Sequence, residues 1–247
     1  MIGIFDSGVG GLFALRELRA CLPMADLLYL GDTRNLPYGE REPWELLALS
    51  RRAVARLAAR GARAVLSACG TVSSVVLPVL RRECPFALYG ILQPTVEATK
   101  RAPRGEVLLL ATQASVQAGV LAAMIEESCS TLVTSLACPE FVTMAEAGVW
   151  QAERAASVLA PARHLRPAAV VLGCTHFSRF AAEIAALFPH AAIIDGAREA
   201  ARAMAAALPP ELCRGQGLCT VLTSGEDDAL FAASEVIYGK DFTAGRV

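Results

Sequence analysis

Lysine is almost missing from this chain. Of its 247 residues, 23 are basic, but only Lys100 and Lys240 are lysines. Pyridoxal phosphate needs a lysine with which it forms a Schiff base. Both lysines stand in polar, loop-like sequence, so we expect no such cofactor. The formal net charge is only −1, which indicates neither a nucleic-acid partner nor binding to an anionic membrane surface.

Familiar catalytic and binding motifs are missing as well. The sequence contains no Gly-x-Ser-x-Gly, His-Glu-x-x-His, P-loop or Gly-x-Gly-x-x-Gly pattern. Its eight cysteines are widely spaced and include no Cys-x-x-Cys pair. We therefore predict no metal site and no disulfide framework.

Signals for secretion or membrane insertion are also weak. The N-terminus has no basic segment followed by a long apolar one, so we expect a cytoplasmic protein. The 19 residues 107–125 carry no formal charge, which is close to the length of a membrane span. However, Gln113, Ser115 and Gln117 interrupt this stretch, and its pattern indicates a strand followed by a helix. We expect no membrane contact.

Apolar runs alternate with helical patterns along nearly the whole chain, which is typical of βαβ units around parallel sheets. In the first half, we predict strands at 2–5, 27–30, 64–68 and 87–92 and helices at 8–22, near 45–60 and from about 71. In the second half, we predict strands at 107–110, 132–136, 170–172 and 192–194, with helices at 114–127, 139–147 and 150–160 and from about 178. The segments 199–208, 220–223 and 227–238 should pack against the first half.

The two halves match at a constant separation. Leu109 follows Ile4 by 105 residues, and Cys174 follows Cys69 by the same 105, which indicates an internal duplication. We therefore predict an α/β fold with two similar doubly wound parallel-sheet domains. The first comprises residues 1–97 and 208–247, the second residues 98–207, and the active site lies in the cleft between them.

Two cysteines occupy matching positions in these halves. Cys69 follows the apolar run 64–68, and Cys174 follows the run 169–173, so each should lie at the carboxyl end of a parallel strand. Ligands bind at such ends. A helix N-terminus lowers the pKa of a thiol from about 8.5, which would make both residues usable bases. Two thiols facing one cleft could take a proton from one face of a carbon and return it to the other. The alternative for each cysteine is a packing role.

Further polar residues stand beside these strand ends. Asp6 ends the first predicted strand and is followed by the run Gly8-Val9-Gly10-Gly11, which opens a helix. Such a turn suits a carboxylate ligand, although it also serves as a plain strand–helix connection. His176 lies two residues after Cys174 and could exchange a proton with it.

These segments together resemble the glutamate racemase family. The resemblance spans nearly the whole chain in order, through the segments GIFDSGVGGL (3–12), LGDT (30–33), LPYG (36–39), ACP (137–139) with Phe141-Val142, LGCTH (172–176) and LTSG (222–225). It implies a cofactor-independent two-base racemase that makes D-glutamate for peptidoglycan in the cell wall, with two α/β domains and often a homodimer.

The resemblance also implies roles for individual residues. Cys69 would deprotonate the D-isomer with help from Asp6. Cys174 would deprotonate the L-isomer with help from His176 and Glu146. The implied substrate-binding residues are Ser7, Pro37, Tyr38, Gly39, Gly70, Thr71, Thr112 and Thr175.

One departure from the family concerns Gly70, which stands where the family usually has asparagine. We expect its missing side chain to enlarge the pocket beside Cys69 and to weaken glutamate binding. Two alternatives stay open: a two-thiol racemase or isomerase for another small acidic substrate, and a non-catalytic amino-acid-binding or regulatory protein. The presence of Asp6, Cys69, Cys174 and His176 together favours an enzyme.

Overall fold

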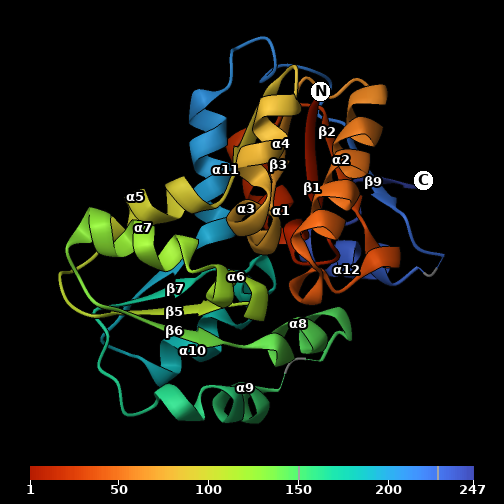
Figure 1. Cartoon of the computed structure of the whole chain (residues 1–247). Coiled ribbons are helices and arrows are strands. Elements are labelled where there is room, and N and C mark those ends of the chain that lie inside the picture. Colours follow the sequence, from red (N-terminus) through yellow and green to blue (C-terminus); the bar gives the residue numbers. More distant parts are fainter. Residues whose placement is uncertain (150, 227) are drawn as a thin grey trace.

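The computed structural model describes residues 1–149, 151–226 and 228–247, whose strands form two separate, wholly parallel sheets (Figure 1). Sheet A has the strand order β10-β9-β2-β1-β3-β4, and sheet B has the order β6-β5-β7-β8. The fold class predicted from the sequence, an α/β fold with two parallel-sheet domains, is confirmed. The strands are β1 (Ile2–Asp6), β2 (Leu27–Gly31), β3 (Ala64–Ser67), β4 (Ala87–Gly90), β5 (Val107–Ala111), β6 (Val133–Ala137), β7 (Ala169–Leu172), β8 (Ala192–Asp195), β9 (Cys219–Thr223) and β10 (Thr243–Arg246).

The strand order itself repeats between the two sheets. Within sheet A the order β2-β1-β3-β4 corresponds to β6-β5-β7-β8 in sheet B. β5, β7 and β8 each begin 105 residues after β1, β3 and β4, and β6 begins 106 residues after β2. Four equivalent strands at one nearly constant offset support the internal duplication.

Helices cover both sheets. They are α1 (Gly11–Cys21), α2 (Pro43–Ala59), α3 (Gly70–Val75), α4 (Leu77–Glu83), α5 (Leu92–Lys100), α6 (Gln113–Ala118), α7 (Val120–Cys129), α8 (Pro139–Glu146), α9 (Ala152–Val158), α10 (Ala181–Leu187), α11 (Gly196–Ala207) and α12 (Ala229–Ile237). Short 3-10 helices are η1 (Thr33–Asn35), η2 (Tyr38–Glu40), η3 (Ala160–Ala162) and η4 (Thr175–Phe180). The long helix α2 has proline and glycine at the positions where helices usually carry them: Pro43 is its first residue, and Gly61 follows its end with a φ of +92°.

Several predicted elements differ from the structure. The strand predicted at 87–92 ends at Gly90, and Pro94 lies in the first turn of α5, where no helical hydrogen bond needs its N–H. The helix predicted at 114–127 is two helices, because Gly119 adopts a left-handed φ of +65° between them. The chain after Cys174 forms η4 before α10 begins, and the sequence did not predict β10. Trp150, the first residue of a predicted helix, and Asp227, the first residue of the segment predicted to pack against the first half, lie outside the described residues.

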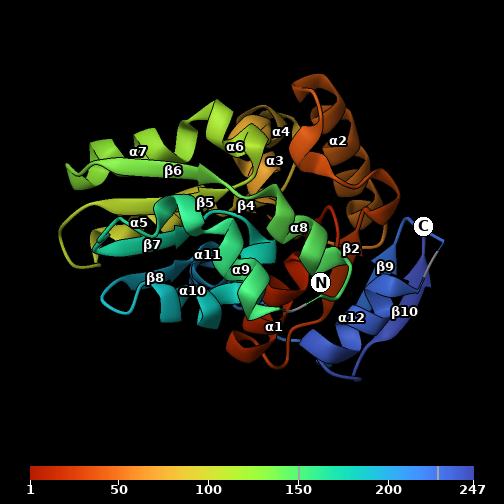
Figure 2. The same cartoon turned by 90° about the horizontal axis from the view of Figure 1, so that it is seen from below.

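The C-terminal strands β9 and β10 join sheet A. β9 pairs with β2, β10 pairs with β9, and Figure 2 shows both beside β2 on the side away from sheet B. α11 packs against α1 and α5 between the two sheets. The exact domain boundaries stay a prediction, and α5 crosses the one placed between residues 97 and 98.

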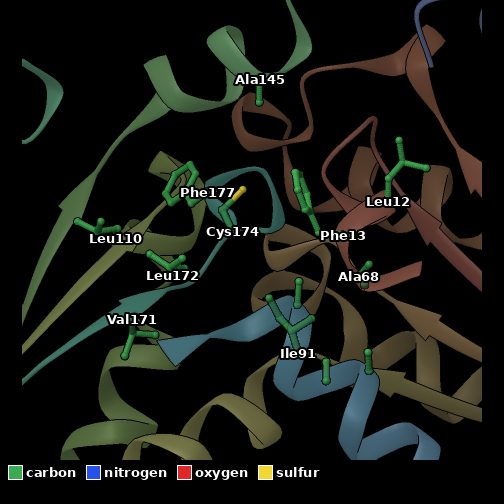
Figure 3. Close-up of a cluster of buried hydrophobic side chains, with 14 of the residues drawn as sticks. Leu12, Phe13, Ala68, Ile91, Leu110, Ala145, Val171, Leu172, Cys174 and Phe177 are labelled. Atoms are coloured by element: carbon green, nitrogen blue, oxygen red, sulfur yellow. The ribbon is translucent and has the colours of Figure 1, made fainter. Parts of the chain in front are cut away.

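The two domains share one apolar core. Leu12, Phe13 and Ile91 of the first domain belong to the same buried cluster as Leu172 and Phe177 of the second (Figure 3). Because apolar contact between the domains is continuous, the strand ends of both are held at one place. Among the described residues, no helix has the length and apolar character needed to cross a membrane.

Candidate active site

A cavity of about 230 Å³ lies where the carboxyl ends of four strands meet. Asp6 ends β1, Cys69 follows β3, Thr112 follows β5 and Cys174 follows β7. Cys69 and Cys174 are both 4% exposed and line this cavity, which therefore brings the two predicted thiols together. Its lining comprises Asp6, Ser7, Pro37, Tyr38, Gly39, Glu40, Cys69, Thr71, Thr112, Gln113, Pro139, Val142, Thr143, Cys174, Thr175 and His176.

Most of the predicted site residues line this cavity, but Glu146 and Gly70 do not. Five lining residues were missed by sequence reasoning: Glu40, Gln113, Pro139, Val142 and Thr143. Pro139 and Val142 stand in a motif already noted, and Glu40 and Thr143 each directly follow a noted motif, so extending those motifs would have found all four. Nothing in the sequence marks Gln113.

Cys174, His176 and Glu146 form a continuous chain of polar contacts. The His176 Nε2–H donates to Glu146 Oε1 at 2.5 Å, and Nδ1 lies 3.5 Å from the Cys174 sulfur. Burial lowers the pKa of His176, but the hydrogen bonds with Cys174 and Glu146 outweigh it and raise the pKa well above its ordinary value. With Nε2–H directed at the carboxylate, Nδ1 is the ring nitrogen that faces the thiol. The imidazole can therefore hold the Cys174 proton or return it.

The glycine run after β1 binds a carboxylate that belongs to the chain itself. The Val9 N–H donates to Glu146 Oε1 at 2.9 Å, across the two domains. A Cβ on Gly8 would overlap the same carboxylate, and a Cβ on Gly10 would lie 2.7 Å from His176 Nδ1. The glycines thus allow the second domain to approach this turn closely.

Asp6 is the buried carboxylate on the Cys69 side of the cavity. It is 1% exposed, and its Oδ2 accepts a hydrogen bond from the Thr175 hydroxyl at 3.0 Å. Its Oδ1 is buried without a hydrogen-bond partner among the described residues. Burial raises the pKa of Asp6 and Glu146 adds to the rise, whereas His176 and the hydrogen bonds from the Ser7 N–H and the Thr175 hydroxyl oppose it. Such a carboxylate holds a proton more readily than an exposed one.

The environment of Cys69 differs from the prediction. The sequence suggested that a helix N-terminus lowers its pKa, and Cys69 does lie at the N-terminus of α3. However, burial and the nearby Asp6 raise the pKa of the Cys69 thiol well above its ordinary value, although the backbone N–H groups of Thr71 and Val72 oppose them. Desolvation outweighs the helix because α3 has only 6 residues and the thiol is buried.

Hydroxyl groups line the cavity between the two domains. Thr71 and Thr112, one from each domain, are 3.0 Å apart at their hydroxyl oxygens, and Thr112 also donates to Ser115 at 2.9 Å. The Tyr38 hydroxyl donates to Asp32 at 2.6 Å, and Ser224 donates to the other oxygen of that carboxylate at 2.6 Å. These bonds fix the donors and acceptors that a small polar ligand would meet.

The structure corrects the expectation that Gly70 enlarges the pocket. A Cβ on Gly70 would overlap the carbonyl oxygen of Gly173 and lie 3.4 Å from Ile91 Cδ1. Gly70 is the first residue of α3, and Gly173 directly precedes Cys174. The space of the missing side chain is therefore filled by backbone of the second domain.

Charge in the cavity is unevenly distributed. Asp6 and Glu40 are its acidic lining residues, His176 can carry positive charge, and neither lysine nor arginine is among the described residues that line it. An anionic ligand would therefore meet hydroxyls and backbone N–H groups. No group of three or more His, Cys, Asp and Glu side chains is placed to hold a metal ion in the described ranges.

Because Asp6 Oδ1 is buried without a hydrogen-bond partner among the described residues, the charge of Asp6 should affect the free energy of unfolding. The pKa of Asp6 is higher in the folded chain than the value of about 3.9 in the unfolded chain, so its ionisation lowers stability above the folded pKa and has no effect well below 3.9. We expect Asp6→Asn to raise the melting temperature at pH 8, by about 2–4 °C for each kcal/mol gained. Thermal unfolding followed by circular dichroism at pH 8 and pH 3 measures this difference, which should disappear at pH 3.

Asp32→Asn is the matched control. Asp32 is also buried, at 4% exposed, but Tyr38, Asn35 and Ser224 donate to its carboxylate. Its replacement should lower the melting temperature. A lower melting temperature for Asp6→Asn at pH 8 would contradict the prediction.

The fold and the cavity define a class of protein: two parallel-sheet domains that present one thiol each to a shared cavity. Residues 18–204 match the Asp/Glu/Hydantoin racemase family. The chain is 36% identical to a glutamate racemase of Thermus thermophilus over 95% of this chain and 91% of that protein. The chain therefore belongs to the Asp/Glu/hydantoin racemase family, whose members are isomerases.

Solved structures agree with this assignment. The glutamate racemase isoform RacE1 from Bacillus anthracis superposes with a TM-score of 0.91 and 25% identity, covering 100% of this chain and 97% of that one. Glutamate racemase from Francisella tularensis in complex with D-glutamate superposes with a TM-score of 0.88 over 100% of this chain and 96% of that one; at 22% identity it shows the fold alone.

Proposed function

We propose that this protein interconverts L- and D-glutamate by proton transfer between two cysteines, without a cofactor. The observation that carries the proposal is the placement of Cys69 and Cys174 at equivalent strand ends, 105 residues apart, on one cavity. Each thiol has a different proton partner, because Asp6 lies on the Cys69 side and His176 contacts Cys174. Inversion of a carbon centre needs a base on one face and an acid on the other.

In the proposed reaction, Cys174 as a thiolate takes the α-proton of L-glutamate, while His176 holds the proton that the thiol gave up. The α-carbon–hydrogen bond breaks, a sulfur–hydrogen bond forms, and the electron pair stays on the α-carbon. The Cys69 thiol then donates its proton to the opposite face, which gives D-glutamate. The reverse direction starts from the Cys69 thiolate, with Asp6 as the acceptor of its proton.

Glutamate is proposed as the substrate because the similar proteins described above are glutamate racemases. The hydroxyls of Thr71 and Thr112 and the backbone near Gly39 suit its carboxylates, because hydroxyls and N–H groups bind anions without a lysine or arginine. Synthesis of D-glutamate for peptidoglycan is the proposed role. A cytoplasmic location and a homodimer stay predictions.

Hydrogen exchange at the α-carbon tests the proposal. We expect the purified protein, incubated with L- or D-glutamate in D₂O and followed by NMR, to replace the α-proton by deuterium and to form the opposite isomer. The reaction should proceed with a metal chelator and without added pyridoxal phosphate. Exchange with aspartate or another acidic amino acid but not with glutamate would identify a different substrate. A lack of exchange with any of them would favour a binding protein.

A further inference from the structure

The Thr175 hydroxyl crosses from the second domain to a carboxylate of the first. Thr175 begins η4 directly after Cys174, yet its Oγ1 donates to Asp6 Oδ2 at 3.0 Å. Both residues are 1% exposed. A threonine hydroxyl has a single proton to donate. While it donates to Asp6, it cannot donate to a substrate carboxylate.

This hydrogen bond leaves the two oxygens of Asp6 in different states. Oδ2 is held by Thr175, whereas Oδ1 is buried without a partner among the described residues, and Asp6 lines the cavity. A buried carboxylate oxygen without a donor has a strong tendency to take up a proton. Thr175 thus fixes the carboxylate with its unpaired oxygen as the proton acceptor.

The neighbouring glycine keeps the space for this contact. A Cβ on Gly10 would lie 2.6 Å from Thr175 Oγ1, closer than real Cβ atoms approach. The hydroxyl can therefore reach Asp6 only because residue 10 has no side chain. Gly10 in the first domain and Thr175 in the second are therefore both needed for this hydrogen bond between the domains.

We propose that Thr175 is a positioning residue for proton transfer at Cys69: it acts through Asp6, although it lies beside Cys174 in the other domain. This inference rests on the proposed racemisation of glutamate. In the step concerned, the Cys69 sulfur–hydrogen bond breaks and an oxygen–hydrogen bond forms at Asp6 Oδ1. The thiolate then takes the α-proton of D-glutamate, and the electron pair of that bond stays on the α-carbon.

The experiment compares Thr175→Val, which removes the hydroxyl at nearly constant shape, with Thr175→Ser, which keeps it. Both variants are assayed with L- and D-glutamate carrying deuterium at the α-carbon. A racemase has an equilibrium constant of one, so kcat/KM must fall equally in both directions; we expect a loss of about tenfold for Thr175→Val. The informative quantity is the substrate isotope effect on kcat/KM in each direction.

Slower transfer at Cys69 has opposite effects on the two labelled substrates. With deuterated D-glutamate, Cys69 removes the label, so the isotope effect should rise above the wild-type value. With deuterated L-glutamate, Cys174 removes the label and the slowed step is donation by Cys69, so the isotope effect should fall below the wild-type value, towards the equilibrium isotope effect of the transfer from carbon to sulfur. Thr175→Ser should keep the wild-type values. Thr175→Ala serves as a second hydroxyl-free variant where Thr175→Val does not fold.

The outcomes separate this inference from the proposed function. A wild-type protein that does not racemise glutamate would overturn both. A racemising wild type with isotope effects unchanged in Thr175→Val, or changed equally in both directions, would overturn the role of Thr175 alone. A higher KM with unchanged isotope effects would show that Thr175 only binds substrate.

Discussion

Replacing either Cys69 or Cys174 by alanine is expected to abolish racemisation. The two thiols line one cavity from equivalent strand ends, and each is proposed to serve one face of the α-carbon. Neither can replace the other, because one removes the proton and the other returns it. A positioned acid or base contributes about 10²–10⁴-fold, and each of these groups takes part in both directions. We therefore expect kcat/KM to fall at least about a thousandfold, measured by circular dichroism of glutamate.

Cys138→Ala is the matched control for this prediction. Cys138 is fully buried and follows strand β6, so its setting resembles that of the two proposed bases, but it does not line the cavity. Burial raises the pKa of its thiol to about 12, and burial raises the pKa of Cys69 as well, so the two residues differ in access to the cavity rather than in burial. Cys138→Ala should racemise glutamate at nearly the wild-type rate. Substantial activity in either Cys69→Ala or Cys174→Ala would end the two-thiol mechanism.

The location of the two thiols could be predicted because it depends on the apolar runs that precede them and on the internal duplication of the chain. Apolar runs in the sequence predicted strands β3 and β7. The common offset of 105 residues then placed Cys69 and Cys174 at equivalent carboxyl ends of these two strands. Ligand sites lie at those ends in parallel sheets. The fold class followed from the same alternation of strands and helices. Where one glycine or proline decides an element, as with Gly119 and Pro94, the periodicity alone gave the wrong boundary.

The contacts between the domains could not be predicted in this way. The sequence indicated that the glycine run after β1 suits a carboxylate, but the carboxylate bound there is Glu146, 137 residues away from Val9. Likewise, the bond from Thr175 to Asp6 joins residues 169 positions apart. Such pairs depend on how the two domains pack, which no local pattern encodes. The pKa of Cys69 also differed from expectation, because burial is a property of that packing.

Gly70 gives the clearest example of a conclusion that the packing reverses. From the sequence, Gly70→Asn should restore a missing amide and improve activity. In the structure, any side chain at this position would overlap the carbonyl oxygen of Gly173, and the backbone cannot move without shifting Cys174, the next residue. Extra atoms in a well-packed site cost about 1–3 kcal/mol. The expected result is therefore a loss of activity and stability.

Gly70→Asn should lower kcat/KM for glutamate by about tenfold to a hundredfold, because displacement of Gly173 moves the Cys174 thiol away from the carbon on which it acts. The melting temperature should fall as well. Gly119→Asn is the control, since a Cβ at Gly119 meets nothing within 4 Å and asparagine tolerates its left-handed φ of +65°. Racemisation assays and thermal unfolding of both variants measure the difference. A Gly70→Asn protein with higher kcat/KM and an unchanged melting temperature would show that the domains can separate enough to admit the amide, so that the close contact between Gly70 and Gly173 does not set the spacing of the two thiols.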